Sequence, residues 1–129
     1  MSGLRDRYCV VGVGETEYSR DSGRSTRAMA VEAIRAAVLD AGLRPAEVDG
    51  MLSYQLADST PAPWVAADLG LRLNFYLDVL GGGSSTEALV GLAMGAIEAG
   101  MCQTVALFRS MNGYTEVRIG GTGARAAQP

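Results

Sequence analysis

The segment over residues 81–87 (GGGSSTE) holds the residue types best suited to chemistry in this chain. It follows an apolar run that predicts a strand and leads into a run that predicts a helix, which places small side chains on a sharp turn. Unpaired N–H groups and the positive end of the helix dipole at such a turn can hold an oxyanion or lower the pKa of a nucleophile. A second interpretation stays open, in which Ser84, Ser85 or Thr86 is only the N-cap of the helix. Residues 81–85 are called the elbow below.

Nucleophilic catalysis through a serine or cysteine lacks its base in this sequence. The chain contains no histidine, so a Ser-His-Asp or Cys-His mechanism cannot be completed from its own residues. Cys9 and Cys102 lie far apart in apolar stretches, which favours two buried, reduced thiols over a disulfide. Two cysteines without a histidine also do not make a zinc site, and we expect no metal.

A second glycine pattern, Gly12-Val13-Gly14, follows an apolar run and invites a dinucleotide-binding interpretation. Glu17 stands at the third glycine position, and a polar loop follows instead of a helix. A P-loop would lack its lysine, and a flavodoxin-like phosphate loop would have to accommodate Glu15 and Glu17. The preferred interpretation is a turn at the end of a strand.

The composition limits the classes of partner. At 129 residues the chain is long enough for one domain but short for an α/β enzyme with a complete site. The net charge is −3 and no two basic residues are adjacent, so nucleic acid is not expected as a partner. No apolar run approaches the length of a membrane span, and the N-terminus lacks the apolar region of a signal peptide. We expect a cytoplasmic protein.

Strand and helix patterns alternate along the chain, which predicts parallel strands in a three-layer α/β architecture. The predicted strands are 8–13, 51–54, 73–80 and 103–108, with a weak signal at 116–119. The predicted helices are 26–41, capped by Ser25 or Thr26 and ended by Gly42, then a single turn at 45–50, then 64–69, and finally a helix from the elbow to residue 99.

The helix predicted after the elbow carries little that suits contact with water. One face is apolar and consists of Ala88, Leu89, Leu92, Ala93, Ala96 and Ile97. Gly91 and Gly95 lie four residues apart on another face, and each costs about 1 kcal/mol relative to alanine in a helix interior. A helix that is apolar nearly all round is normally buried, so we expect it in the middle of a large fold.

Together these features resemble the thiolase superfamily. Thiolases carry Cys-x-Ser-Gly ahead of a small, aliphatic helix that ends in Ala-Ile-x-x-Gly, and the segment 96–100 (AIEAG) matches that ending. The opening VGVGET, the helix around 30–43 and the tripeptide 48–50 (VDG) are similar to the lipid-transfer and sterol-carrier branch. The resemblance spans residues 8–109.

The resemblance implies a three-layer thiolase-like fold of which this chain forms the N-terminal βαβαβαβ half, with a buried central helix. Residues 1–109 would be that domain, and residues 110–129 would begin the substrate-covering loop region or form a flexible tail. The missing C-terminal half would come from more of the same protein or from a second polypeptide, and this half alone is expected to be inactive.

The elbow departs from the thiolase pattern at its most important position. Aligned without gaps from Ile97 backwards, the thiolase nucleophile falls on Gly83, with Ser84 beside it, while Cys9 and Cys102 lie on the wrong elements. Relatives that lost this cysteine include the thiolase-like aldolases of steroid side-chain degradation. These cleave β-hydroxyacyl-CoA by a retro-aldol reaction, with catalytic groups from the C-terminal half and an OB-fold, zinc-ribbon partner.

The resemblance therefore implies a lipid-transfer-type protein that handles acyl-CoA or steroid-CoA esters in carbon–carbon bond cleavage, retro-aldol rather than thiolytic. The coenzyme A thioester would be the substrate, with no permanently bound cofactor and no catalytic residue assigned in this chain. The substrate-binding residues implied by the elbow are Gly82, Gly83, Ser84 and Ser85. The alternative function is a non-catalytic acyl-lipid or CoA-ester binding or assembly domain.

The same resemblance implies an interface. In the family the third strand pairs antiparallel across a dimer two-fold axis, so we expect a homodimer. The implied interface residues are Asn74, Phe75, Tyr76, Leu77, Asp78 and Val79.

Overall fold

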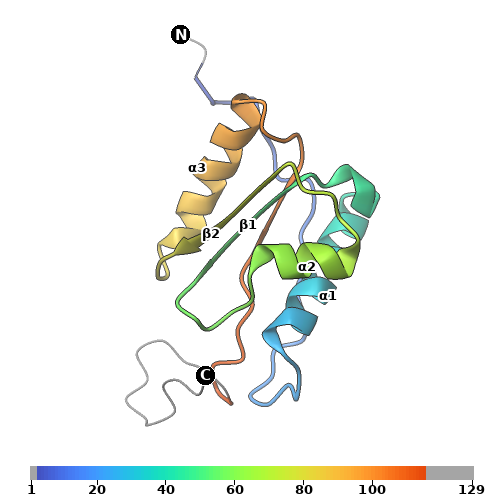
Figure 1. Ribbon diagram of the computed structural model, residues 1–129, viewed down its shortest axis with the longest axis vertical. Helices are drawn as coiled ribbons and strands as arrows, with labels where there is room; N and C mark the ends of the chain where they lie inside the picture. The colour runs from blue at the N-terminus through green and yellow to red at the C-terminus, as the bar shows by residue number, and fades with distance from the viewer. Residues whose placement is uncertain (1–2, 116–129) are drawn as a thin grey trace.

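A computed structural model describes residues 3–115 of the chain, and they form three layers. The central layer is a parallel sheet with strand order β2-β1-β3. Helices α1 and α2 cover one face of the sheet and α3 covers the other (Figure 1). The predicted three-layer α/β architecture is thereby confirmed. The strands are β1 (Gly50–Gln55), β2 (Phe75–Leu80) and β3 (Val105–Phe108); the helices are α1 (Thr26–Asp40), α2 (Ala62–Leu69) and α3 (Ser85–Glu98), with a short 3-10 turn at Pro45–Glu47.

The central strand β1 divides the core into two halves, because successive side chains of a strand point to opposite faces. Met51 is fully buried in the cluster formed with α1 and α2. Leu52 and Tyr54 belong to the opposite cluster, where they meet Leu89 and Ala93 of α3. The continuous burial of β1 is typical of a central parallel strand that is covered on both faces.

Helix boundaries follow the local signals of the sequence. The Ser25 hydroxyl accepts a hydrogen bond from the N–H of Ala28 at 3.1 Å, so Ser25 is the N-cap of α1 as predicted. Gly42 follows the end of α1 with a φ of 67°, and Gly70 ends α2 with the same φ. Positive φ costs glycine little, which explains why glycine ends both helices.

Asp49 joins the beginnings of the three strands. Its carboxylate accepts the backbone N–H groups of Gln103 and Thr104, at 2.8 and 2.9 Å, where the chain enters β3. Its carbonyl accepts the N–H of Asn74, just before β2, at 2.8 Å. The next residue, Gly50, has no room for a side chain, since a Cβ would lie 2.9 to 3.2 Å from atoms of Val105 and Cys102. These contacts explain why aspartate and glycine occupy the last two positions of the Val-Asp-Gly tripeptide.

The strand predicted at residues 8–13 is wrong. This segment is not part of the sheet, and Val10, Val11 and Val13 are more than half exposed. It runs along α1, where the N–H of Val13 donates to the carboxylate of Asp40 at 2.9 Å. β-Branched residues form a strand only when a neighbouring strand is available for pairing. Here the backbone is instead hydrogen-bonded to a side chain of α1.

Gly12 and Gly14 explain how that segment approaches α1 so closely. A Cβ on Gly12 would lie 2.3 Å from the carbonyl oxygen of Ala37, and one on Gly14 would lie 2.2 Å from that of Ala33. The Gly-x-Gly pattern therefore serves backbone packing on a helix. It is not a turn at the end of a strand, as the sequence suggested.

Helix α3 has one buried and one open face among the described residues. Leu89, Ala93 and Ala96 pack toward the sheet, whereas Val90 and Leu92 are each 42% exposed. A Cβ added to Gly91 or Gly95 would meet no atom within 4 Å. The close backbone approach expected at these glycines does not occur between residues of this chain, and burial of the outer face remains a prediction about a larger fold.

The two cysteines differ in environment. Cys102 is buried as expected, but Cys9 is exposed because its segment lies outside the sheet; neither forms a disulfide. Burial, with a smaller contribution from the negative charge of Asp49, raises the pKa of the Cys102 thiol. Among residues 3–115, none of the helices has the length and apolar character needed to cross a membrane. The weak strand signal at 116–119 lies outside the described residues.

Candidate functional site

The elbow lies where β2 ends and α3 begins, as the sequence predicted. The N–H of Gly81 donates to the carbonyl of Gln55 at 3.4 Å, which keeps the elbow beside the end of β1. The N–H of Ser85 donates to the carbonyl of Gly82 at 3.0 Å and closes the turn. That bond uses the N–H of Ser85. The next N–H groups of the first turn of α3 have no carbonyl partner one turn earlier in the helix, so they present partial positive charge at the elbow.

The three glycines of the elbow serve different purposes. A Cβ on Gly81 would lie 2.2 Å from the hydroxyl oxygen of Ser85, so this position must stay small. Gly82 and Gly83 have open space where a side chain would begin. Gly83, which the resemblance to thiolases places at the nucleophile position, has steric room for a side chain but carries none.

The two serines of the elbow point to different surroundings. Ser84 is the N-cap residue of α3, yet its side chain makes no capping hydrogen bond and the residue is exposed. Ser85 is 8% exposed and its hydroxyl lies against Gly81. The capping interpretation of the sequence thus lacks its hydrogen bond at Ser84. The hydroxyl of Ser84 is the one that the elbow leaves open to a ligand.

Thr86 connects the elbow to the end of β1. Its hydroxyl donates to the phenol oxygen of Tyr54 at 3.2 Å. Tyr54 is 9% exposed, and its ring belongs to the core cluster under α3. The first turn of α3 is therefore tied to the sheet through a side chain that is itself held by packing.

A buried ion pair lies on the other side of Tyr54. Both terminal nitrogens of Arg109 donate to the carboxylate of Asp58, and one of them also donates to the carbonyl of Tyr54 at 2.9 Å. The side chain of Asp58 is 1% exposed and that of Arg109 is 16% exposed. The guanidinium carbon lies 4.5 Å from the centre of the Tyr54 ring, within the range of a cation–π contact.

The surroundings of Asp58 favour its charged form. Burial by itself would raise the pKa of this carboxyl group, because it disfavours the charge. The hydrogen bonds from Arg109 and from the backbone N–H of Leu56 act in the other direction and outweigh it, so the pKa lies below its ordinary value. Asp58 is therefore an ionised anchor for Arg109 and not a proton donor at neutral pH.

Asp78, the polar exception in the apolar strand β2, has a structural partner. Its carboxylate accepts the N–H of Ala62, at the start of α2, at 2.9 Å and also accepts the hydroxyl of Ser53 on β1. A carboxylate at a helix N-terminus is favoured by the helix dipole. Its side chain therefore joins β1, β2 and α2 within this chain.

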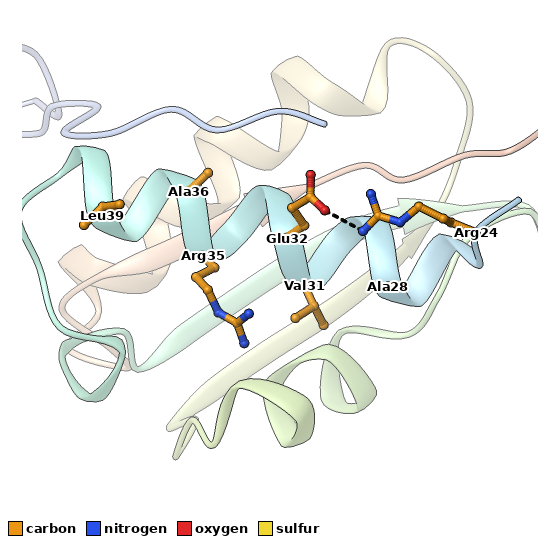
Figure 2. A pocket seen from close by; sticks show the side chains of 7 residues that line it. All are labelled: Arg24, Ala28, Val31, Glu32, Arg35, Ala36 and Leu39. Carbon is orange, nitrogen blue, oxygen red and sulfur yellow. Dashed lines mark hydrogen bonds and ion pairs between the residues drawn. The ribbon is translucent and has the colours of Figure 1, made fainter. Parts of the chain in front are cut away.

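Neither of two surface hollows is lined by a residue of the elbow. Figure 2 shows the first, of about 370 Å³, along the outer face of α1, where Arg24 and Glu32 pair with each other at 2.5 Å. The second, of about 510 Å³, lies between residues 14–22 and residues 109–115. Its wall includes Arg109, so the residues that follow β3 begin beside the buried ion pair. Within residues 3–115, no three side chains of the types that bind metals gather into a cluster.

Comparison with known proteins places these features in context. No family model matches the chain. The chain is 37% identical over 121 residues to a steroid side-chain-cleaving aldolase of Thermomonospora curvata, covering 93% of the chain and 31% of that protein. The chain is therefore similar in sequence to a steroid-cleaving aldolase along nearly its whole length. It is also 33% identical over 126 residues to the 17-hydroxy-3-oxo-4-pregnene-20-carboxyl-CoA lyase of Mycobacterium tuberculosis, covering 97% of the chain and 32% of the lyase.

Solved structures agree with these matches. The chain superposes on the Ltp2-ChsH2(DUF35) aldolase with a TM-score of 0.77 and 37% identity, over 87% of this chain and 29% of that one. It superposes on a monomeric SCP2-thiolase-like protein from Mycobacterium smegmatis with a TM-score of 0.62 and 26% identity, over 75% of this chain and 22% of that one. The resemblance to the thiolase-like aldolase branch is thereby confirmed. The chain spans about a third of the length of the curated relatives it matches.

The structure brings Tyr54, Asp58, Thr86 and Arg109 together beside the elbow. Thr86 lies in the segment that the sequence singled out, whereas the other three were not predicted for the site. One feature of the sequence could have indicated Tyr54, Asp58 and Arg109. Tyr54 and Asp58 lie at or just after the end of a predicted strand, and Arg109 directly follows another. The carboxyl ends of adjacent parallel strands lie at the same edge of a sheet, where ligand sites of α/β folds collect.

Proposed function

We propose that this chain is the elbow-bearing, N-terminal part of an enzyme that cleaves the side chain of a steroid-CoA ester by a retro-aldol reaction. The observation that carries the proposal is the match, along 93% and 97% of the chain, to two proteins named as a steroid side-chain-cleaving aldolase and a steroid-CoA lyase. The domain boundary at residue 109 belongs to this proposal, as does the role of residues 110–129 as the start of the substrate-covering region.

In the proposed reaction the bond between the α- and β-carbons of a β-hydroxyacyl-CoA breaks. The β-hydroxyl loses its proton and becomes a ketone, and the electron pair of the broken bond is delocalised into the thioester as an enolate. Protonation of the α-carbon then releases a shorter acyl-CoA. No oxidant and no free coenzyme A are consumed, so the atoms balance without a co-reactant.

The elbow would serve this reaction by holding the thioester oxygen. Negative charge develops on that oxygen in the enolate, and preorganised N–H groups at a helix N-terminus stabilise such charge. The substrate-binding residues of the proposal are Gly82, Gly83, Ser84 and Ser85, with the hydroxyl of Ser84 exposed to the ligand. The groups that remove and return protons would come from the remainder of the protein.

The composition of the elbow argues against the thiolytic alternative. Thiolysis through an acyl-enzyme requires a nucleophile, and Gly83 at the corresponding position cannot be acylated. Ser84 would require a base from outside this chain, which contains no histidine. A reaction without a covalent acyl intermediate fits these residues better.

The test uses the complete protein together with its OB-fold, zinc-ribbon partner, which this proposal includes. The substrate is the 17-hydroxy-3-oxo-4-pregnene-20-carboxyl-CoA ester. We expect a steroid 17-ketone and a three-carbon acyl-CoA in equal amounts, at a rate that does not depend on added coenzyme A. A requirement for free coenzyme A, or burst acylation of this chain by acetyl-CoA, would contradict the proposal.

The alternative is a non-catalytic domain that binds acyl-lipid or CoA esters. The lack of a nucleophile in the chain favours it as a second candidate. Isothermal titration of the complete protein with the same ester separates the two: binding without turnover, even when the partner is present, would favour the alternative. Cleavage of the bound ester by the complete protein would exclude the non-catalytic alternative.

The proposal also includes a homodimer through β2. This strand lies at the edge of the sheet, and Tyr76 and Leu77 are 54% and 39% exposed. The outer backbone groups of an edge strand are unpaired and can join a second copy. Because one solved relative is described as monomeric, the oligomeric state needs a direct measurement.

A further inference from the structure

Four side chains form a continuous series of contacts from a buried ion pair to the elbow. Asp58 holds Arg109 through two hydrogen bonds. Arg109 lies over the ring of Tyr54 and also binds its carbonyl. Tyr54 accepts the hydroxyl of Thr86 in the first turn of α3. Each side chain contacts the next, and the last belongs to the helix end that forms the elbow.

This series of contacts joins three separate parts of the sequence. Asp58 lies in the loop after β1, Arg109 directly follows β3, and Thr86 lies in α3. The side chain of Asp58 is 1% exposed, so its carboxylate has little contact with water. Such an ion pair is stable only when the hydrogen-bond geometry between the two side chains is good. The guanidinium is planar and bound at two points, so its position over Tyr54 is restricted.

The same contact at the protein surface would not have this consequence. Arg27 also pairs with a carboxylate through two hydrogen bonds, to Asp68, and its guanidinium carbon lies 5.6 Å from the ring centre of Trp64. Those two charged side chains are 43% and 39% exposed, and Trp64 is 56% exposed. The surface trio touches no part of the elbow and provides a natural control.

We propose that Arg109, held by Asp58, is a positioning residue that acts through Tyr54 and Thr86 to fix the first turn of α3 at the elbow. This inference rests on the proposed function, in which N–H groups of that turn stabilise the thioester oxygen. Preorganised donors lose their effect when they are misplaced by a fraction of a hydrogen-bond length. None of the four side chains needs to touch the substrate for the effect to occur.

The first experiment measures backbone amide exchange at residues 89 and 90 in the purified chain. Their N–H groups donate to carbonyls of the first turn of α3, so exchange there reports how firmly that turn is held. Tyr54→Phe removes the acceptor of Thr86 but keeps the ring under Arg109, and Arg109→Lys keeps the charge but not the two-point contact. Both should accelerate exchange at these amides about three- to tenfold, the effect of losing one or two hydrogen bonds. The controls are Arg27→Lys and Tyr8→Phe. Tyr8 donates to Glu98 at the opposite end of the same helix, so neither control should change exchange at residues 89 and 90.

The second experiment measures steady-state kinetics of the complete enzyme with the steroid-CoA ester. Tyr54→Phe and Thr86→Val should each lower kcat about three- to tenfold and leave KM within about twofold, and the double variant should lose no more than the worse single variant. A purely structural role would lower the amount of folded enzyme but leave kcat per folded molecule unchanged. That result would overturn the proposal.

The two experiments separate failure of the inference from failure of the proposed function. If exchange at residues 89 and 90 in Tyr54→Phe and Arg109→Lys stays within twofold of the controls, the positioning role is wrong whatever the turnover. If exchange responds but kcat does not, the contacts hold the helix without serving the reaction, and the inference is again overturned. If the wild-type enzyme shows no turnover, the proposed function has failed, and the exchange data alone decide whether these side chains fix the elbow.

Discussion

Arg109 and Asp58 form a two-pronged ion pair in which the carboxylate is almost completely buried, although the two residues lie 51 positions apart in the chain. The pair connects the residue after β3 to the loop after β1. Removing one partner of a buried pair leaves the other charge without compensation, which costs more than the pair itself contributes.

Asp58→Asn should therefore lower the free energy of unfolding by about 3 kcal/mol at pH 7. The matched surface change, Asp68→Asn, breaks the exposed pair with Arg27 and should cost at most about 1 kcal/mol. Urea denaturation of the two variants beside the wild type measures both values. Equal losses in the two variants would show that burial of Asp58 does not strengthen its interaction.

The contribution of Asp58 should also depend on pH. Its pKa in the folded chain lies below the ordinary value of about 3.9, so its stabilisation is fully present above that value. As pH falls through the folded pKa the carboxylate is protonated and the stabilisation is lost. The difference in unfolding free energy between wild type and Asp58→Asn should stay constant from pH 7 to pH 5 and shrink below about pH 4. A difference that grows as pH falls would contradict this sign.

Glycine positions should differ sharply in tolerance. Gly14→Ala places a Cβ against backbone atoms of α1, at 2.2 Å from a carbonyl oxygen, and should cost about 1–3 kcal/mol. Gly83→Ala meets open space and has no positive φ, so it should be neutral or stabilise by up to about 1 kcal/mol. Thermal and urea denaturation provide the comparison. A loss at Gly83 as large as that at Gly14 would mean that the elbow is not open.

A thiol at the elbow should report its electrostatics. Ser84→Cys, at the N-cap of α3, should have a thiol pKa below about 8.5, because the helix N-terminus stabilises the thiolate. The pH dependence of alkylation by iodoacetamide measures it, with Cys9→Ser as the background so that one exposed thiol is present. The thiol of Cys9 in the unmodified chain, which lies outside any helix, is the reference. If the introduced thiol and Cys9 have equal pKa values, the support for an oxyanion site is removed.

The native cysteines should react very differently. Cys9 is exposed, whereas Cys102 is 4% exposed and its thiol pKa is raised by burial and by Asp49. A thiol-specific chromogenic reagent at pH 8 should therefore modify one thiol per folded chain quickly and the second only in denaturant. Mass spectrometry of the labelled peptides identifies which one reacted. Fast labelling of Cys102 in the folded chain would show that its segment opens readily.

The proposed association through β2 can be tested at its exposed edge. Leu77→Lys places a charge on the edge strand, which opposes pairing with a second copy, and it should convert a dimer to a monomer in sedimentation equilibrium. The control is Leu39→Lys on the outer face of α1, where the native leucine is 79% exposed; it should leave the mass unchanged. A wild-type chain that sediments as a monomer at all concentrations would remove β2 as the interface of this chain.

The local chemistry of the sequence determined most of the helices and strands. The hydroxyl of Ser25 and the glycines at 42 and 70 mark helix ends through their own backbone preferences, which act over a few residues. The elbow was predictable for the same reason, since a glycine run between an apolar strand and an apolar helix-forming stretch admits few other conformations. The resemblance to thiolases then predicted that Gly83 stands where a nucleophile would lie.

Only the tertiary structure decided the features that depend on residues far apart in the chain. The apolar run at 8–13 has the composition of a strand, but strand pairing requires a distant partner, and Gly12 and Gly14 let the segment pack on α1 instead. Tyr54, Asp58, Thr86 and Arg109 carry no shared motif, because their contacts arise only when the ends of β1 and β3 meet the start of α3. Periodicity and capping report short-range preferences, whereas this convergence is set by the packing of the whole sheet.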